Sequence, residues 1–160
     1  MIAALDTNVL LDILFDDQKF AEESRSKLEE LSEEDFFIIS PEVYSELIAA
    51  FKRVSDNPKQ ELDEFLDEKS ISLREHSPNS LELAGVKWND YTSSDTVRCP
   101  SCGETKEVEC SCGEQITWRN HLITDFMIGG HAQVLADKLV TRDNGYFQRY
   151  FEIDIIDSGE

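Results

Sequence analysis

Short apolar runs alternate with longer amphipathic segments along this chain. Residues 1–5 are apolar and end at Asp6, and residues 139–141 lead directly into the turn-forming sequence Arg-Asp-Asn-Gly. Short apolar runs that stop at a charge or a turn are typical of buried β-strands. Further strands are expected at residues 35–39, 70–73 and 153–156, the last of them at an edge of the sheet.

Segments with a helical repeat of apolar positions separate these strands. Amphipathic helices are expected at residues 18–31 and 58–68, and residues 80–91 are also expected to be helical. Ser40 and Pro41 indicate a helix start, because a serine cap and a proline at the first helical position both favour one. The apolar stripe of that helix consists of Val43, Leu47, Ala50 and Val54.

The alternation of strands and helices predicts an α/β sandwich in which helices flank a central, mainly parallel sheet. With 160 residues and 40% hydrophobic content, the chain is expected to form a single domain, residues 1–160. Ligands of such sheets bind outside the carboxyl ends of the strands, where the strand order reverses. Asp6 and Asp143 each follow a predicted strand, so we expect them to meet at this edge.

Two further carboxylates lie on predicted helices. Glu46 lies at the edge of the apolar stripe that follows Pro41, and Asp125 shares a helical face with Ile128, Gly129, Ala132 and Ala136. We expect that face to be buried, and a buried carboxylate requires a partner or a metal ion. Gly129 and Gly130 strengthen the inference, because a glycine inside a helix costs about 1 kcal/mol relative to alanine and so implies close packing or a close ligand.

Four sequence segments resemble the PIN-domain ribonucleases, and most closely the small VapC-like toxins of toxin-antitoxin pairs. They are LDTNVLLD at the start, SPEVYSEL, TDFMIGGHA, and LVTRDNGYF near the end. The resemblance covers nearly the whole chain except about residues 92–117. It implies a catalytic, metal-binding quartet with polar neighbours, and these residues are Asp6, Glu46, Asp125 and Asp143, with Thr7, Asn8 and Thr141 beside them.

The resemblance implies a metal-dependent endoribonuclease that hydrolyses RNA phosphodiester bonds. The chemistry accounts for the carboxylates, because clustered Asp and Glu bind Mg²⁺ or Mn²⁺ through hard oxygen ligands. Such an ion activates water and neutralises charge on phosphate oxygens. Without a metal, four close acids would repel one another and some would hold protons. The alternative is that these four residues are ordinary surface acids, because the chain has 34 Asp and Glu residues. Asp12, Asp16 or Asp137 could also be mistaken for members of the quartet.

The net charge of −19 is unusual for a protein that binds nucleic acid, because such sites are normally basic. We interpret the acidity as an adaptation to high salt, as in halophilic archaea, where salt screens self-repulsion. An acidic surface for a basic partner is the alternative. The sequence has no apolar stretch near 18 residues and no leader, so we expect a cytoplasmic protein without membrane contact.

All four cysteines fall within the segment at residues 92–117, which we expect to be an insertion in the domain. Cys99, Cys102, Cys110 and Cys112 have the spacing C-x2-C-x7-C-x-C, which indicates one structural Zn²⁺ with four thiolate ligands. The insertion would then be a zinc-ribbon-like hairpin beside the active site. Disulfides, free thiols, or partial ligation completed by His121 are the alternatives, and a reducing cytosol argues against disulfides.

Two other functions remain open at this point. One is a PIN-type endonuclease for ribosomal RNA maturation, and the other is a non-enzymatic module that binds RNA or docks a partner through the insertion. A homodimer and an antitoxin partner are expected from the resemblance to VapC-like toxins. The expected interface consists of helical apolar stripes that a small domain would leave uncovered, namely Phe20, Leu28 and Leu31 with Leu47, Ala50 and Phe51.

Overall fold

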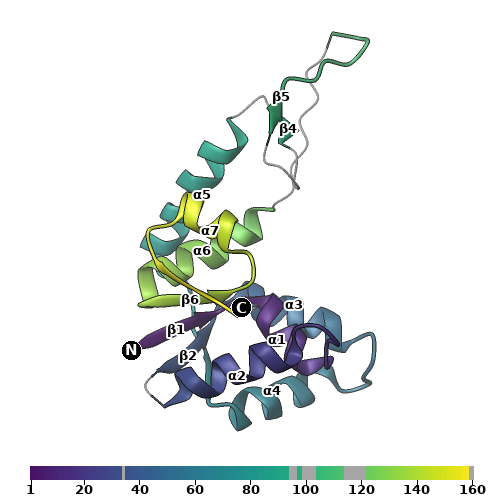
Figure 1. Cartoon of the computed structure of the whole chain (residues 1–160), viewed down its shortest axis with the longest axis vertical. Coiled ribbons are helices and arrows are strands. Elements are labelled where there is room, and N and C mark those ends of the chain that lie inside the picture. Colours follow the sequence, from purple (N-terminus) through teal and green to yellow (C-terminus); the bar gives the residue numbers. More distant parts are fainter. Residues whose placement is uncertain (34, 94–96, 99–103, 114–121, 159–160) are drawn as a thin grey trace.

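A five-stranded parallel sheet forms the centre of the computed structural model (Figure 1), which describes residues 1–33, 35–93, 97–98, 104–113 and 122–158. The strands of this sheet are β1 (Ile2–Leu5), β2 (Phe36–Ile39), β3 (Ile71–Leu73), β6 (Lys138–Thr141) and β7 (Asp154–Asp157). The helices are α1 (Thr7–Leu14), α2 (Ala21–Ser32), α3 (Pro41–Phe51), α4 (Pro58–Glu68), α5 (Pro78–Thr92), α6 (Ile123–Leu135) and α7 (Asn144–Tyr150).

The strand order is β3-β2-β1-β6-β7, and every pair of neighbours in this sheet is parallel. Strands β2 and β3 therefore extend the sheet on one side of β1. Strands β6 and β7, from the second half of the chain, extend it on the other side. Helices lie on both sides of the sheet, with α1, α2 and α4 on one side and α5, α6 and α7 on the other (Figure 1). The α/β sandwich predicted from the alternation of elements is confirmed.

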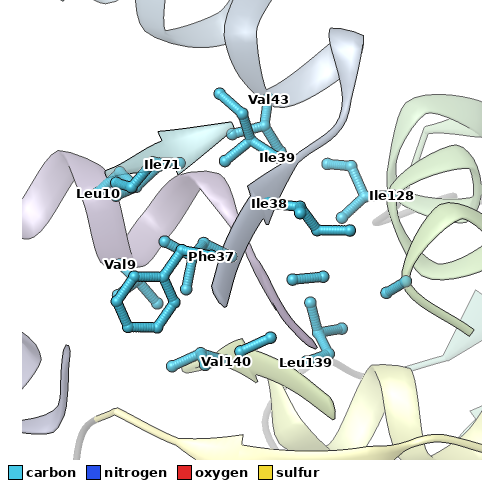
Figure 2. Packing of buried hydrophobic residues seen from close by; sticks show 14 of the residues in the cluster. Val9, Leu10, Phe37, Ile38, Ile39, Val43, Ile71, Ile128, Leu139 and Val140 are labelled. Carbon is cyan, nitrogen blue, oxygen red and sulfur yellow. The ribbon is translucent and has the colours of Figure 1, made fainter. Parts of the chain in front are cut away.

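The core lies on both faces of the sheet (Figure 2). Val9 and Leu10 of α1 and Ile128 of α6 pack against strand residues, and Leu139 and Val140 are fully buried. Strands that are covered on both faces read as continuous apolar runs, which is why the sequence pattern located β1, β2 and β6. The sequence also placed β3 and the edge strand β7, although both are more exposed. Among the described residues, no helix combines the length and the apolar character that a membrane span requires.

Helix α3 begins as the sequence predicts and ends earlier than its apolar stripe suggests. The hydroxyl of Ser40 caps the helix by accepting a hydrogen bond from the Val43 amide at 3.4 Å, and Pro41 occupies the first turn. The helix ends at Phe51, and the chain then turns, so that Val54 is 67% exposed. The prediction that Val54 belongs to the buried stripe was wrong, because a periodic pattern does not mark where a helix stops.

Helix α7 was not predicted, because Asn144 and Gly145 suggest a turn after β6. The helix begins at Asn144 instead, directly after Asp143, and packs Tyr146 and Phe147 into the core. The short helix closes the path from β6 to the edge strand β7, which was correctly placed by the sequence. Asp143 is therefore held at a strand-to-helix junction.

The two glycines of α6 allow close packing, as the sequence suggested. A Cβ atom on Gly130 would lie 2.6 Å from the carbonyl oxygen of Ser80, at the start of α5, and one on Gly129 would collide with the ring of Phe151. The Ser80 carbonyl is backbone and cannot move cheaply, so position 130 requires glycine, whereas a side chain at position 129 would require the Phe151 ring to shift. Close contact of α6 with α5 fixes the position of the first turn of α6, which carries Asp125.

The segment at residues 92–117 contains a short antiparallel strand pair, which does not lie beside the acidic edge of the sheet as the sequence led us to expect (Figure 1). Its strands are β4 (Val97–Arg98) and β5 (Thr105–Lys106), and Figure 1 shows that they project away from the sheet, beyond α5. Cys110 and Cys112 follow the hairpin, whereas Cys99, Cys102 and His121 lie outside the described residues. The predicted zinc site thus has only two of its four ligands in the described part of the chain.

Candidate functional site

Asp6 lies at the switch point of the sheet, where strand order reverses between β1 and β6. It follows β1 directly and acts as the N-cap of α1, with one carboxylate oxygen accepting a hydrogen bond from the Thr7 amide at 2.7 Å. The other oxygen accepts hydrogen bonds from the Thr141 hydroxyl at 2.6 Å and from the Asn8 side-chain amide at 2.7 Å. The three residues expected to be polar neighbours of the quartet are therefore all found around Asp6.

Burial dominates the electrostatics of Asp6, whose residue surface is only 7% exposed. Loss of solvation raises the pKa of Asp6 to about 6, although hydrogen bonds from Thr141 and Thr7 oppose the shift. The negative charges of Asp125 and Glu46 raise this pKa further. Carboxylates from β1, α3 and α6 therefore influence one another at this edge of the sheet. A buried acid with neighbouring acids is a common sign of a functional site.

Glu46 reaches the same place from α3. It is half-buried, and its carboxylate accepts a short hydrogen bond from the Thr7 hydroxyl. Thr7 and Asp6 are adjacent in the chain, so this bond ties α3 to the start of α1. Position 46 on the edge of the apolar stripe places the carboxylate at the rim of the core, as the sequence suggested.

Asp125 and Asp143 are less buried than the sequence pattern indicated. Asp125 is half-buried in the first turn of α6, where its carboxylate accepts a hydrogen bond from the Leu122 amide at 2.7 Å. Asp143 is exposed, and its amide donates to the Thr141 hydroxyl at 3.0 Å. The face predicted for Asp125 is buried at Ile128, Gly129 and Ala132, whereas Asp125 itself, at the start of α6, is only half-buried.

Tyr146 lies near both of these acids and was not identified from the sequence. The residue is 7% exposed, and burial raises the pKa of its hydroxyl, with the charges of Asp125 and Asp143 adding to the shift. The hydroxyl therefore stays protonated at all physiological pH values. Phe126 packs edge to face on the Tyr146 ring, with ring centroids 5.4 Å apart. The aromatic contact connects the α7 helix to the first turn of α6.

The donor set at this edge suits a hard cation such as Mg²⁺ or Mn²⁺, because it consists of carboxylate oxygens. Among the described residues, however, no group of three or more His, Cys, Asp or Glu side chains is arranged ready to hold a metal ion. Hydrogen bonds from Thr141, Thr7 and Leu122 hold the carboxylates of Asp6, Glu46 and Asp125. Without a cation the carboxylates repel one another, and this repulsion favours hydrogen bonds from neighbouring donors over a close approach of the carboxylates to each other. The chemistry of the residues fits the metal.

Three acids that could have been mistaken for site residues have other partners. Asp12 is buried on α1 and forms an ion pair with Arg142. Asp137 accepts a hydrogen bond from the Ile2 amide at 2.7 Å, at the amino end of β1. Asp16 forms an exposed ion pair with Arg25. None of the three is needed to explain the electrostatics of Asp6.

The geometry defines the class of the molecule as an α/β protein with an acidic site at the switch point of a parallel sheet. The PIN domain family profile matches residues 3–88, and the chain belongs to the PIN domain family. The match covers Asp6 and Glu46, and the fold brings Asp125 from outside the match to the same edge. No curated protein sequence gives a significant match.

Solved structures share the fold over nearly the whole chain. A chain of VapBC2 from Rickettsia felis, bound to a DNA fragment from its promoter, is similar over 98% of both chains, with 21% identity and a TM-score of 0.65. A chain of VapBC-1 from nontypeable Haemophilus influenzae is similar over 100% of both chains, with 23% identity and a TM-score of 0.63. FitAcB from Neisseria gonorrhoeae gives 17% identity and a TM-score of 0.62, over 99% of this chain and 98% of that one.

The raised pKa of Asp6 predicts a pH-dependent stability in the presence of chelator. The unfolded chain releases this proton near pH 3.8, whereas the folded protein keeps it to about pH 6. The free energy of unfolding due to Asp6 should therefore fall by about 2 kcal/mol as pH rises from 4 to 7. Denaturant unfolding of wild type and Asp6→Asn at both pH values measures this change. The free energy of unfolding of the variant should rise relative to that of wild type as pH rises.

A matched control has the opposite sign. A hydrogen bond from Lys59 lowers the pKa of Asp63, so this carboxylate contributes stability at neutral pH that is lost as pH falls. Asp63→Asn should therefore lose stability relative to wild type as pH rises, in contrast to Asp6→Asn. The opposing result is that wild type and Asp6→Asn differ in free energy of unfolding by the same amount at pH 4 and pH 7. That result would contradict the burial of an uncompensated carboxylate at position 6.

Proposed function

We propose that this protein is a metal-dependent endoribonuclease and the toxin of a toxin-antitoxin pair. The observation that carries the proposal is Asp6, a carboxylate buried at the switch point of the sheet, with a pKa raised to about 6 by burial and by the charges of Glu46 and Asp125. Membership of the PIN family and the fold shared with VapBC and FitAB chains support the same conclusion. These neighbours favour a toxin over a ribosomal RNA maturation enzyme.

The residues that would hold Mg²⁺ or Mn²⁺ are Asp6, Glu46, Asp125 and Asp143. When bound, the ion would activate a water molecule and neutralise charge on the phosphate. Thr141 and Asn8 orient the Asp6 carboxylate by donating to it, and Thr7 orients Glu46 in the same way. Tyr146 offers a protonated hydroxyl near Asp125 and Asp143, where it can donate a hydrogen bond. Asp143, the most exposed acid, lies where substrate can approach.

A cleavage assay tests the proposal. Purified protein should cut single-stranded or structured RNA when Mg²⁺ or Mn²⁺ is present, and excess chelator should stop the reaction. An open reading frame for a small basic or amphipathic protein directly upstream of the gene would support the toxin assignment. Absence of metal-dependent cleavage across a panel of RNAs, in protein freed of any co-purified antitoxin, would favour the non-enzymatic alternative.

We also propose that the insertion at residues 92–117 binds one structural Zn²⁺ through Cys99, Cys102, Cys110 and Cys112. In support, Cys110 and Cys112 interact directly, and hydrogen bonds from the backbone and side chain of Cys112 lower the pKa of the Cys110 thiol. A lowered pKa favours the thiolate, which is the form that binds metal. Gly113 has a φ of 91°, and its amide donates to the Cys110 carbonyl at 2.8 Å, which makes a tight turn around the pair.

Elemental analysis of purified protein should therefore give about one zinc per chain. Thiolate ligation supplies on the order of 10 kcal/mol in zinc-finger peptides, so chelation should unfold the insertion while the sheet domain stays folded. Cys110→Ser combined with Cys112→Ser should abolish zinc binding. Protein with less than half a zinc per chain and four freely titratable thiols would refute the zinc site.

Homodimerisation is a further part of the proposal, and the structure changes the expected interface. Leu28, Leu47 and Phe51 are buried in the core, so they are not the uncovered stripe that the sequence suggested. Phe15, which packs on Phe51, and Val54 are 42% and 67% exposed and remain available for a symmetric contact or for an antitoxin helix. A chain of charge −19 should dimerise more tightly as salt rises. Sedimentation at low and molar salt measures this, and a monomer throughout would refute the dimer.

A further inference from the structure

Arg142 lies between two residues of the candidate site, but its side chain points away from that site. The preceding residue, Thr141, donates to Asp6, and the following residue is Asp143. The guanidinium group of Arg142 instead forms an ion pair with Asp12 on α1, in which Nη2 donates a hydrogen bond to Oδ1 at 2.9 Å and Nε lies 2.8 Å from Oδ2 without forming a hydrogen bond. The charge-assisted hydrogen bond and the close ion contact hold the two side chains together. Arg142 therefore connects the short segment at the end of β6 with α1.

Asp12 is itself held rigidly. Its residue surface is 3% exposed, and it accepts a hydrogen bond from the Ser24 hydroxyl of α2 at 3.0 Å. The guanidinium carbon of Arg142 lies 4.2 Å from the centre of the Phe20 ring, which precedes α2. One arginine thus connects the end of β6 with α1 and α2.

A second contact between the same segment and α1 involves Asn8. The amide of Arg142 donates to the Asn8 side-chain oxygen at 3.3 Å, while the Asn8 side-chain nitrogen donates to Asp6 at 2.7 Å. Asn8 and Asp12 are four residues apart, so they lie on one face of α1, one turn from each other. The segment at residues 141–143 is therefore fixed to that face at two points.

We propose that Arg142 and Asp12 form a positioning pair that sets the distance between Asp6 and the exposed Asp143. The proposal rests on the proposed function for its catalytic consequence, but the positional effect can be measured separately. Asp143 has no burial of its own to hold it, so its position depends on the residues on either side. Displacement of a reacting group by about 1 Å can cost on the order of 100-fold in rate, so a fixed segment matters for catalysis.

Hydrogen exchange tests the positional part without activity. Asp12→Asn removes the charge of the partner, and Arg142→Lys keeps the positive charge but loses the planar guanidinium and its Nη2 hydrogen bond to Asp12. Both variants should exchange the backbone amides of residues 141–144 at least about tenfold faster than wild type does. The matched control is Arg25→Lys, because Arg25 of α2 donates to the Ile13 carbonyl of α1 and pairs with Asp16 just after α1, but is not a partner of residues 141–143. This control should exchange like wild type.

Kinetics and metal binding test the consequence for the site. Residues that support metal ligands typically contribute 10-fold to 100-fold in affinity or activity. Asp12→Asn should lower kcat about 100-fold and Arg142→Lys about 10-fold, each with KM within about threefold of wild type. The Kd for Mn²⁺, measured by electron paramagnetic resonance of the free ion, should rise about 10-fold in Asp12→Asn. Arg25→Lys should change none of these values.

Absence of RNA cleavage by the wild-type protein would refute the proposed function. Hydrogen exchange would still show whether Arg142 and Asp12 hold residues 141–144 in place. Wild-type exchange rates at residues 141–144 in both folded variants would overturn the positioning pair, whatever the cleavage assay shows. Arg142→Lys protects the test against misfolding, since it keeps the charge opposite buried Asp12.

Discussion

Asp6→Asn should abolish metal-dependent RNA cleavage, with a loss of at least about 1,000-fold, and leave the fold intact. The change removes the charge that would bind the cation but keeps the shape of the side chain. Asp6 lies at the switch point and accepts hydrogen bonds from Thr7, Asn8 and Thr141, so no neighbouring acid can take its place. Cleavage of a labelled RNA under single-turnover conditions measures the loss.

Asp12→Asn and Asp137→Asn separate the role of position 6 from a general effect of acid removal. Asp137 lies at the opposite end of β1, where it accepts from the Ile2 amide, so Asp137→Asn should cleave like wild type. Asp12→Asn should be impaired about 100-fold, less than Asp6→Asn, because it acts through Arg142. A cleavage rate of Asp6→Asn within tenfold of the wild-type rate would exclude Asp6 as a metal ligand, once contaminating nuclease has been shown to be absent.

Gly130→Ala should destabilise the protein by about 2 kcal/mol, whereas Gly85→Ala should stabilise it by about 0.5 kcal/mol. The added methyl group at position 130 would meet the Ser80 carbonyl at 2.6 Å, so α5 and α6 would have to separate. Gly85 lies inside α5 and would meet no atom within 4 Å, so alanine there only improves helix propensity.

Thermal unfolding distinguishes these two glycines. About 2 kcal/mol corresponds to a fall in Tm of about 5 °C for a domain of this size. Asp125 lies in the first turn of α6, so Gly130→Ala should also reduce cleavage, in contrast to Gly85→Ala. Equal Tm values for the two variants would show that α5 and α6 can separate without cost.

The sequence predicted those features that depend on neighbouring residues. The central strands β1, β2 and β6 were found because they are buried, and the start of α3 was found because Ser40 and Pro41 are local signals. Helix α7 was missed because Asn144 and Gly145 are also good turn residues, and only the burial of Tyr146 and Phe147 selects the helix. Tertiary packing decided this case.

The sequence named the candidate acids and three polar neighbours, Thr7, Asn8 and Thr141, but not the exposure of each acid or the contacts of Arg142. Motifs around Asp6, Glu46, Asp125 and Asp143 identified the candidates, but exposure of Asp143 and partial burial of Asp125 depend on how α6 and α7 pack. The pair of Arg142 and Asp12 joins residues 130 positions apart, and no local pattern marks such a contact. The sequence set Asp12 aside as a ligand, and its partner Arg142 was visible only in three dimensions.

The order of strands in the sheet also determines when the site is completed during synthesis. Strands β1, β2 and β3 pair with one another and come from the first 73 residues, whereas β6 pairs with β1 across the whole chain. Thr141, which donates to Asp6, is 135 residues away from it. Domains fold as their chain emerges from the ribosome, so a nascent chain holds Asp6 and Glu46 long before it holds Asp125 and Asp143. The proposed acidic quartet is therefore assembled only after β6 has been synthesised and has paired with β1.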